Sequence, residues 1–164
     1  MNIIGVTITD NLSMHSHIST ICQSASQNLF AIKLIHSRGL NLQSIHSLST
    51  ALILPKLTYA SAAWWGFTNA SDRARMQAVI NKAIRWGLYD QEAPSVDEVC
   101  NKHDLKLILT VLNNPSHSLH SLLPPIKTTG YDMRKRAHNR WLIVKENPYT
   151  EKNFICRMLY ELYH

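Results

Sequence analysis

Several features that often disclose the class of a protein are scarce in this 164-residue sequence. The cysteines are few and widely separated: Cys22, Cys100 and Cys156. Isolated cysteines in an odd number argue against a disulfide framework or a CxxC zinc site, and they favour a reducing compartment, nuclear or cytoplasmic. The longest apolar run, 51–67, is interrupted by Pro55 and Lys56, so we expect no transmembrane helix. The N-terminus also lacks the basic segment and apolar core of a secretory signal.

The usual motifs of catalysis are missing as well. Only five glycines occur, and none forms a phosphate-cradling GxGxxG or GxxxxGK loop or the GxSxG elbow of a serine hydrolase. No two aspartates stand together to hold a pair of magnesium ions, and the adjacent Asp97 and Glu98 are explained as part of a helix cap. The closest histidine pairs are His15 with His17 and His117 with His120. Neither pair has further ligands nearby, so the sequence predicts no metal site and no catalytic residue.

The sequence does contain enough apolar residues for a folded core, and its charge is unevenly distributed. Apolar residues make up 45% of the chain, charged residues make up 17%, and the formal net charge is +6. The segment 73–85 holds four basic residues and no acid, and 127–145 holds six basic residues against Asp132. Two basic segments on a slightly acidic remainder favour a polyanionic partner. The alternative interpretation is a solvated helix face together with a basic loop.

The apolar spacing predicts a mainly α-helical fold with one short N-terminal β-strand. We expect the strand over 2–9 and helices over 17–39, 41–55, 57–66, 69–85, 95–112 and 152–162. The expected N-caps are Asn41, Asn69 or Ser71, and the S-x-x-E box of Ser95 and Glu98. Pro55 is expected to kink or break the second helix, because proline removes a backbone donor and clashes with the preceding turn.

The helix over 69–85 has a sharply divided surface. Its apolar stripe consists of Met76, Val79, Ile80, Ala83 and Ile84. Arg75, Lys82 and Arg85 fall on the opposite flank and are expected to face outward. Beyond this helical part, which we place at 1–112, the segment 113–130 is rich in proline and serine and is expected to be a linker. A basic segment and a C-terminal helix follow over 131–164.

The aromatic residues allow two interpretations. Tyr59, Trp64 and Trp65 have small apolar neighbours, which favours a place in the core over a stacking surface for bases. Trp86 and Trp141 stand next to or near arginines. Each could pair with a guanidinium group or a nucleobase, although packing is the commoner use of tryptophan.

The order of several short segments resembles one known family. The sequence reads NIIGVTI at 2–8, DNLSM at 10–14, HI at 17–18 and LPKLTYASAAW at 54–64. It continues with QAVINK at 77–82, YDMRKR at 131–136 and NFICRM at 153–158. Together these resemble the region just after the polymerase active site of non-LTR retrotransposon reverse transcriptases, which are RNA-directed DNA polymerases. Ile4 and Met14 depart from the family pattern, where leucine and tryptophan are usual.

The resemblance implies a primer-grip-like strand followed by a helical thumb and connection region. In that family the paired aspartates that hold the catalytic magnesium ions lie upstream of the segment matched by NIIGVTI. No catalytic residue and no cofactor can therefore be assigned to this chain, and Mg²⁺ is implied only for an intact parent polymerase. We expect a non-catalytic region that binds the backbone of RNA or an RNA–DNA hybrid.

The expected phosphate contacts form two groups. They are Arg73, Arg75, Lys82 and Arg85 in the first, and Arg134, Lys135, Arg136 and Arg140 in the second. The rival interpretation is a non-enzymatic helical relic that acts as a protein-interaction module or has no function. That relic would associate with itself, or with the missing upstream polymerase segment, through apolar residues exposed at Ile3, Ile4 and Val6. A histidine-metal protein is a third, weaker interpretation.

Overall fold

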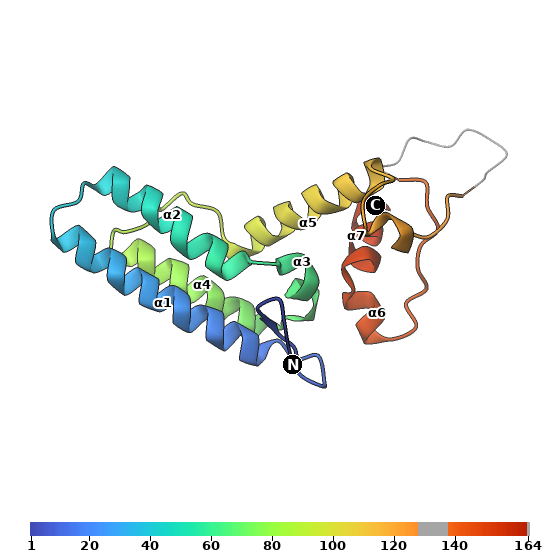
Figure 1. The fold of residues 1–164 in the computed structure, drawn as a ribbon, viewed down its shortest axis with the longest axis horizontal. Helices are drawn as coiled ribbons and strands as arrows, with labels where there is room; N and C mark the ends of the chain where they lie inside the picture. Colours follow the sequence, from blue (N-terminus) through green and yellow to red (C-terminus); the bar gives the residue numbers. More distant parts are fainter. Residues whose placement is uncertain (128–137, 164) are drawn as a thin grey trace. The chain divides into compact units, whose positions relative to one another are not determined.

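The structure, a computed structural model, describes residues 1–127 and 138–163. It is mainly helical with a short antiparallel sheet at its N-terminal end, as the sequence predicts (Figure 1). Contacts divide the chain into two compact units, Met1–Cys100 and Asn101–His164. Helix α5 (Val96–Asn113) passes from the first unit into the second, and the described part of the expected linker, 113–127, belongs to the second unit. Among the described residues, no helix combines the length and the apolarity needed to cross a lipid bilayer.

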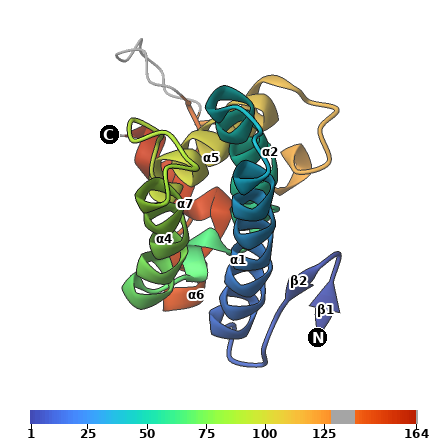
Figure 2. The ribbon, with the colours of Figure 1, turned by 90° about the vertical axis from the view of Figure 1, so that its left-hand side faces the viewer.

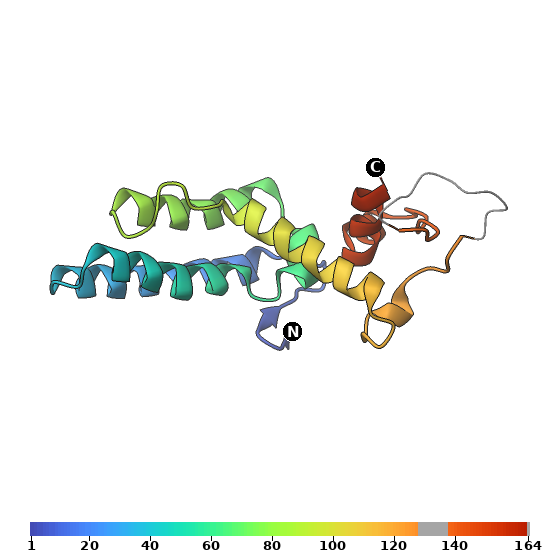
Figure 3. The same cartoon turned by 90° about the horizontal axis from the view of Figure 1, so that it is seen from above.

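The first unit is built on three long helices that lie side by side. They are α1 (His15–Ser37), α2 (Leu42–Thr58) and α4 (Ala70–Arg85). Helices α1 and α4 run in the same direction and α2 runs opposite to both (Figure 1, Figure 3). The short α3 (Ser61–Trp64) and the 3₁₀ helix η1 (Trp65–Phe67) join α2 to α4. The helix ends follow the predicted caps, because Asn41 accepts a hydrogen bond from the Ser44 amide and Asn69 accepts one from the Asp72 amide.

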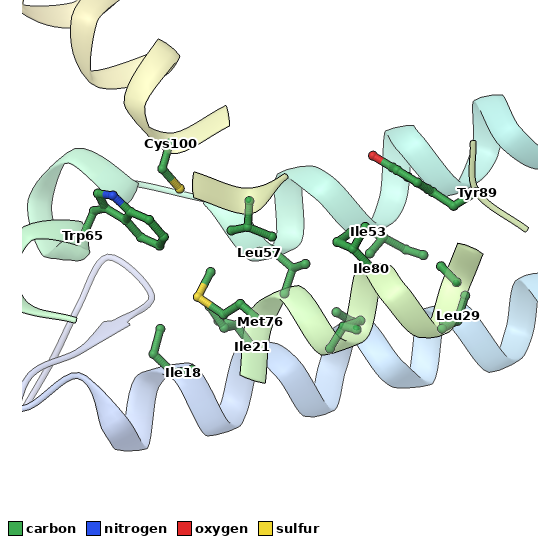
Figure 4. Close-up of a cluster of buried hydrophobic side chains, with 14 of the residues drawn as sticks. Ile18, Ile21, Leu29, Ile53, Leu57, Trp65, Met76, Ile80, Tyr89 and Cys100 are labelled. Carbon is green, nitrogen blue, oxygen red and sulfur yellow. The ribbon is translucent and has the colours of Figure 1, made fainter. Parts of the chain in front are cut away.

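The core of this unit lies between α1, α2 and α4. Figure 4 shows apolar side chains from the three helices pointing toward one another. They include Ile18, Ile21 and Leu29 from α1, Ile53 and Leu57 from α2, and Met76 and Ile80 from α4. The predicted stripe of α4 is confirmed, with Ile84 only partly buried at its edge. Trp64 and Trp65 are each 1% exposed, so their placement in the core is also confirmed.

Pro55 does not break α2, so the expectation of a break is wrong, and the expectation of a kink stays a prediction. The helix continues through Pro55 to Thr58. Ile53 and Leu57 flank the proline and are fully buried, while Pro55 itself is exposed. The carbonyl that loses its helical partner belongs to the exposed Ala51, where water can reach it. Burial of the two apolar side chains, at about 1.5–3 kcal/mol each, offsets the cost of a proline in a helix, about 3 kcal/mol.

The single strand expected over 2–9 is instead a small β-hairpin. Strands β1 (Asn2–Ile3) and β2 (Val6–Thr7) pair in antiparallel fashion, with Ile3 opposite Val6. Ile4 and Gly5 form the two-residue turn, and both have positive φ angles, 48° and 83°. Such a turn matches the twist of two paired strands, so the chain folds back on itself at Ile4 and Gly5. The β-branched residues on both sides of the turn are the reason why the sequence predicts one continuous strand. Figure 2 shows the hairpin beside the N-terminal end of α1.

The second unit has its own small core. It contains the C-terminal part of α5, the 3₁₀ helix η2 (His120–Leu122), α6 (Pro148–Lys152) and α7 (Phe154–Tyr163). Buried apolar residues are Ile108, Val111, Leu123, Ile155, Met158 and Leu159. The single helix expected over 152–162 is thus preceded by a separate turn of helix, because Asn153 adopts an extended conformation between α6 and α7. An ion pair between Asp104 and Arg157, 2.6 Å apart, ties α5 to α7 inside this unit.

Candidate nucleic-acid interface

The long helices of the first unit carry charge of almost one sign. Between residues 11 and 89 Asp72 is the only acidic residue, and its side chain is 2% exposed. The basic residues of the same stretch are Lys33, Arg38, Lys56, Arg73, Arg75, Lys82 and Arg85. The surfaces of α1, α2 and α4 therefore present cations to solvent and no exposed carboxylate. The exposed carboxylates of Asp90 and Glu92 follow directly after α4 and line a hollow together with Ile84 and Gly87. The absence of acids is visible in the sequence, but only the fold shows that Asp72 is turned inward.

Asp72 is held where the first turns of α1 and α4 meet. Its Oδ1 lies 3.1 Å from Nδ1 of His15 and 3.6 Å from Nη1 of Arg75. The other terminal nitrogen of Arg75 donates a hydrogen bond to Oγ of Ser19 at 2.9 Å. Because Arg75 neutralises a buried carboxylate and bridges two helices, much of its charge serves the fold. The prediction that Arg75 faces outward holds only in part, since its side chain is 37% exposed.

Arg73 also has partners within the unit. Its Nε donates to Oγ1 of Thr68 at 2.9 Å, and Nη1 donates to Asp97 at 3.3 Å. The guanidinium carbon lies 4.4 Å from the centre of the buried Trp65 ring. These contacts fix Arg73 between the start of α4 and the start of α5. Of the expected contacts on α4, Arg73 and Arg75 in its N-terminal half are thus the two that pair with carboxylates.

The C-terminal half of α4 is different. Nζ of Lys82 lies 4.6 Å from the centre of the Trp86 ring, and Nζ of Lys33 from α1 lies 4.4 Å from the same ring. Arg85 is exposed one turn along from Lys82. None of these three cations forms an ion pair with a carboxylate within the described ranges. We call Lys33, Lys82, Arg85 and Trp86 the lysine–tryptophan cluster.

Lys33 is a member of this cluster that sequence reasoning missed. It is an isolated lysine in α1, with Phe30, Ala31, Leu34 and Ile35 around it, and no local pattern links it to α4. The parallel packing of the C-terminal ends of α1 and α4 brings the lysine to Trp86 (Figure 1). Trp86 therefore pairs with ammonium groups, where proximity in sequence suggested an arginine.

The second expected group of phosphate contacts is described only at Arg140. Arg134, Lys135 and Arg136 lie outside the described residues. Nη1 of Arg140 donates to the Pro124 carbonyl at 2.8 Å, and Nη2 lies 3.0 Å from Nε2 of His120. Its backbone forms an isolated bridge with Ile126. Arg140 thus joins two irregular segments of the chain, near Pro124 and near Arg140 itself, inside the second unit.

The remaining aromatic candidates are split between the two units. Tyr59 is 52% exposed, so the expectation that it lies in the core with the neighbouring tryptophans is wrong. Trp141 is 57% exposed, and Nζ of Lys127 lies 5.3 Å from its ring centre. As with Trp86, the cation beside Trp141 is a lysine.

The histidines have mainly structural partners. His17 is buried, its Nδ1 accepts a hydrogen bond from the Thr7 amide at 3.4 Å, and its ring meets that of Trp64 edge-on. Burial lowers the pKa of His17 below its ordinary value of 6.5, because desolvation penalises the charged form. His15 lies beside Asp72, on a different side of α1 from His17. Nowhere in the described part do three His, Cys, Asp or Glu side chains gather as ligands for a metal ion.

No protein-family model, curated protein or solved structure matches this chain. The site is therefore characterised by its own geometry. It combines a single sign of exposed charge on the three long helices with a group of cations at the C-terminal ends of α1 and α4, near the exposed carboxylates of Asp90 and Glu92. Such a surface is suited to a polyanion that is contacted through its charged groups.

Proposed function

We propose that the helical bundle of the first unit binds the sugar-phosphate backbone of RNA or an RNA–DNA hybrid. The observation that carries this proposal is the lack of any exposed carboxylate between residues 11 and 89, a stretch with seven basic residues. Lys33, Lys82 and Arg85 are the principal phosphate contacts, because their charges have no carboxylate partner among the described residues. Backbone contacts of this kind position a protein on nucleic acid without reading its sequence.

The shape of the cluster supports binding along a strand. Lys33 approaches Trp86 from α1 and Lys82 approaches it from α4, so these two cations flank the seam between two parallel helices. Arg85 is exposed one turn beyond Lys82 on α4. Arg75 lies seven residues before Lys82, which is about 10 Å along the helix axis. It has residual exposure and can add a weaker contact at the other end of the same seam. A phosphate chain laid along the seam would therefore meet positive charge at both ends.

We further propose that this unit corresponds to the post-catalytic region of a non-LTR retrotransposon reverse transcriptase. The support is the order of the matching sequence segments, the mainly helical fold and the basic surface of α4. We assign no catalytic residue and no cofactor to this chain. Its contribution to polymerisation would be to hold nucleic acid, while the chemistry would require carboxylates from a separate part of the polymerase.

The test is the salt dependence of binding to a labelled RNA–DNA hybrid, measured by fluorescence anisotropy. Each phosphate contact contributes about −0.9 to the slope of log affinity against log salt for duplex DNA. Replacing Lys33, Lys82 and Arg85 with alanine together should weaken binding and flatten the slope by about 2 to 3. Lys56→Ala is the matched control, because Lys56 is exposed in the last turn of α2, which runs opposite to α1 and α4. A slope that is unchanged in the triple variant would remove the cluster from the interface.

A specific observation favours a second candidate, a protein-interaction module. Met1, Ile3 and Ile4 in the hairpin are 79%, 44% and 82% exposed, whereas Val6 is buried. The expectation that the N-terminal segment leaves apolar surface open therefore holds for Ile3 and Ile4, and it is wrong for Val6, which packs into the core. Light scattering distinguishes the candidates: a monomer that binds hybrid supports the first, and oligomers that bind none support the second.

A further inference from the structure

Phe30 is an exposed aromatic residue beside the lysine–tryptophan cluster. Its side chain is 65% exposed, while Leu29 and Ile32 on the same helix are buried in the core. Phe30 stands three residues before Lys33, so the two side chains are neighbours on the surface of α1. Leu34, one turn further along from Phe30, is 52% exposed. Neither the fold nor the contacts to phosphates explain an exposed aromatic ring at this place.

We propose that Phe30 is a stacking surface for an unpaired base, which makes the cluster a binding site for single-stranded nucleic acid. This inference rests on the proposed backbone-binding function and adds the class of ligand. The phosphates of the same strand would meet Lys33 and Lys82, and the base attached to them would lie on the ring of Phe30. Single-strand binders commonly combine a positive groove with aromatic rings in this way.

Phe30 is better placed for stacking than the tryptophan of the cluster. The centre of the Trp86 ring already has two ammonium groups within 4.4 and 4.6 Å, and its side chain is partly buried. The Phe30 ring has no aromatic or cationic partner among the described residues. An incoming base can therefore reach Phe30 without displacing a cation. A fully paired duplex would leave this ring unused, because the faces of its internal bases are stacked on one another.

The surroundings of Phe30 favour a nucleic acid over an anionic membrane. A helix that lies on a lipid surface buries a broad apolar face. On α1, the exposed positions one and two turns before Phe30 are Gln27 and Gln23, and the partly exposed Ser26 lies on the same side. Toward the N-terminus of α1 the apolar surface around Phe30 thus ends at polar groups, while toward the C-terminus it continues at Leu34 and Ile35, beside Lys33. That arrangement suits a nucleotide, because its base can stack on the aromatic ring while its phosphate contacts the neighbouring basic and polar groups.

The experiment compares three fluorescein-labelled ligands of equal length: a single-stranded RNA, the same strand with abasic sites, and a blunt RNA–DNA hybrid. Phe30→Ala should weaken binding of the normal single strand by about 5- to 150-fold, the range expected for the loss of one stacked base. Phe30→Leu should lose most of this affinity as well, because it keeps apolar surface without an aromatic face. Leu34→Ala is the matched control and should leave the affinity unchanged. Circular dichroism confirms that each surface variant stays folded.

The abasic strand separates stacking from every other contact. Wild-type protein should bind it as weakly as Phe30→Ala binds the normal strand, and hybrid binding should be the same in both proteins. Equal affinity of wild type and Phe30→Ala for the single strand would overturn the stacking site while leaving backbone binding intact. Lack of binding to all three ligands would overturn the proposed function itself. Phe30-dependent binding to phosphatidylserine vesicles without RNA binding would identify a membrane and would also refute this inference.

Discussion

The turn of the N-terminal hairpin offers a prediction of increased stability. Ile4 has a φ of 48° in a turn where the next residue, Gly5, also has positive φ. A left-handed conformation costs an L-residue about 1–2 kcal/mol, and a β-branched residue is especially rare there. Asparagine followed by glycine is the preferred pair for a two-residue hairpin with positive φ at both positions. Asparagine is also an L-residue and recovers only part of this cost, so we expect Ile4→Asn to stabilise the hairpin by up to about 1 kcal/mol.

The structure indicates that this gain has little to offset it. Ile4 is 82% exposed, so its replacement removes almost no buried apolar contact. Gly5→Ala provides the opposite change in the same turn. A Cβ at Gly5 would meet the Tyr59 ring at 3.6 Å, an ordinary van der Waals distance, so the cost of alanine is conformational. It should destabilise the hairpin by about 1 kcal/mol or more.

Amide hydrogen exchange measures the local effect directly, because the hairpin can open without the rest of the unit unfolding. The reporter is the Ile8 amide, which donates to the Met1 carbonyl at 2.8 Å. A gain of up to about 1 kcal/mol should slow its exchange up to about 5-fold in Ile4→Asn. Ile4→Val keeps the β-branch and the strain, and it should exchange at the wild-type rate. Faster exchange in Ile4→Asn would refute the reasoning and would show that the isoleucine side chain is itself stabilising.

Two further predictions concern buried charged or titratable groups. Asp104 is fully buried against Arg157, so Asp104→Asn should lower the free energy of unfolding of the second unit by about 3–5 kcal/mol in urea denaturation. The double variant Asp104→Leu/Arg157→Met should have a free energy of unfolding close to that of the wild type. Equal losses of stability in the single and the double variant would contradict the interpretation of a desolvated ion pair. Because burial lowers the pKa of His17, the unfolded first unit takes up a proton more readily than the folded one. The stability of the first unit should be greatest above pH 6.5 and should fall as the pH decreases below that value. His17→Leu should remove this part of the pH dependence. An unchanged pH profile in the variant would show that other groups cause it.

Local sequence predicted the caps of α2, α4 and α5 well, whereas the single helix expected over 57–66 is divided among the end of α2, the short α3 and η1. Asn41 and Asn69 cap α2 and α4, and Ser95 with Glu98 forms the expected reciprocal cap, with the Ser95 amide donating to Glu98 at 2.7 Å. These hydrogen bonds join residues three apart, so a short sequence contains all the atoms involved. The same bonds lower the pKa of Glu98, because they stabilise its charged form. The differences from the prediction have separate causes: burial of Ile53 and Leu57 favours a continuous α2 through Pro55, and the positive φ angles of Ile4 and Gly5 turn the expected strand into a hairpin.

The sequence by itself determined the helical class of the fold, the buried stripe of α4 and the excess of positive charge. Each depends on the type and spacing of residues along one segment, which the chain specifies directly. Only the tertiary structure decided which cations remain available to a ligand. Arg73 and Arg75 are held by Asp97 and Asp72, whereas Lys33 from another helix joins Lys82 beside Trp86. The reason is physical: whether a charge is paired or open to solvent depends on groups brought near it by packing, often from residues far away in the chain.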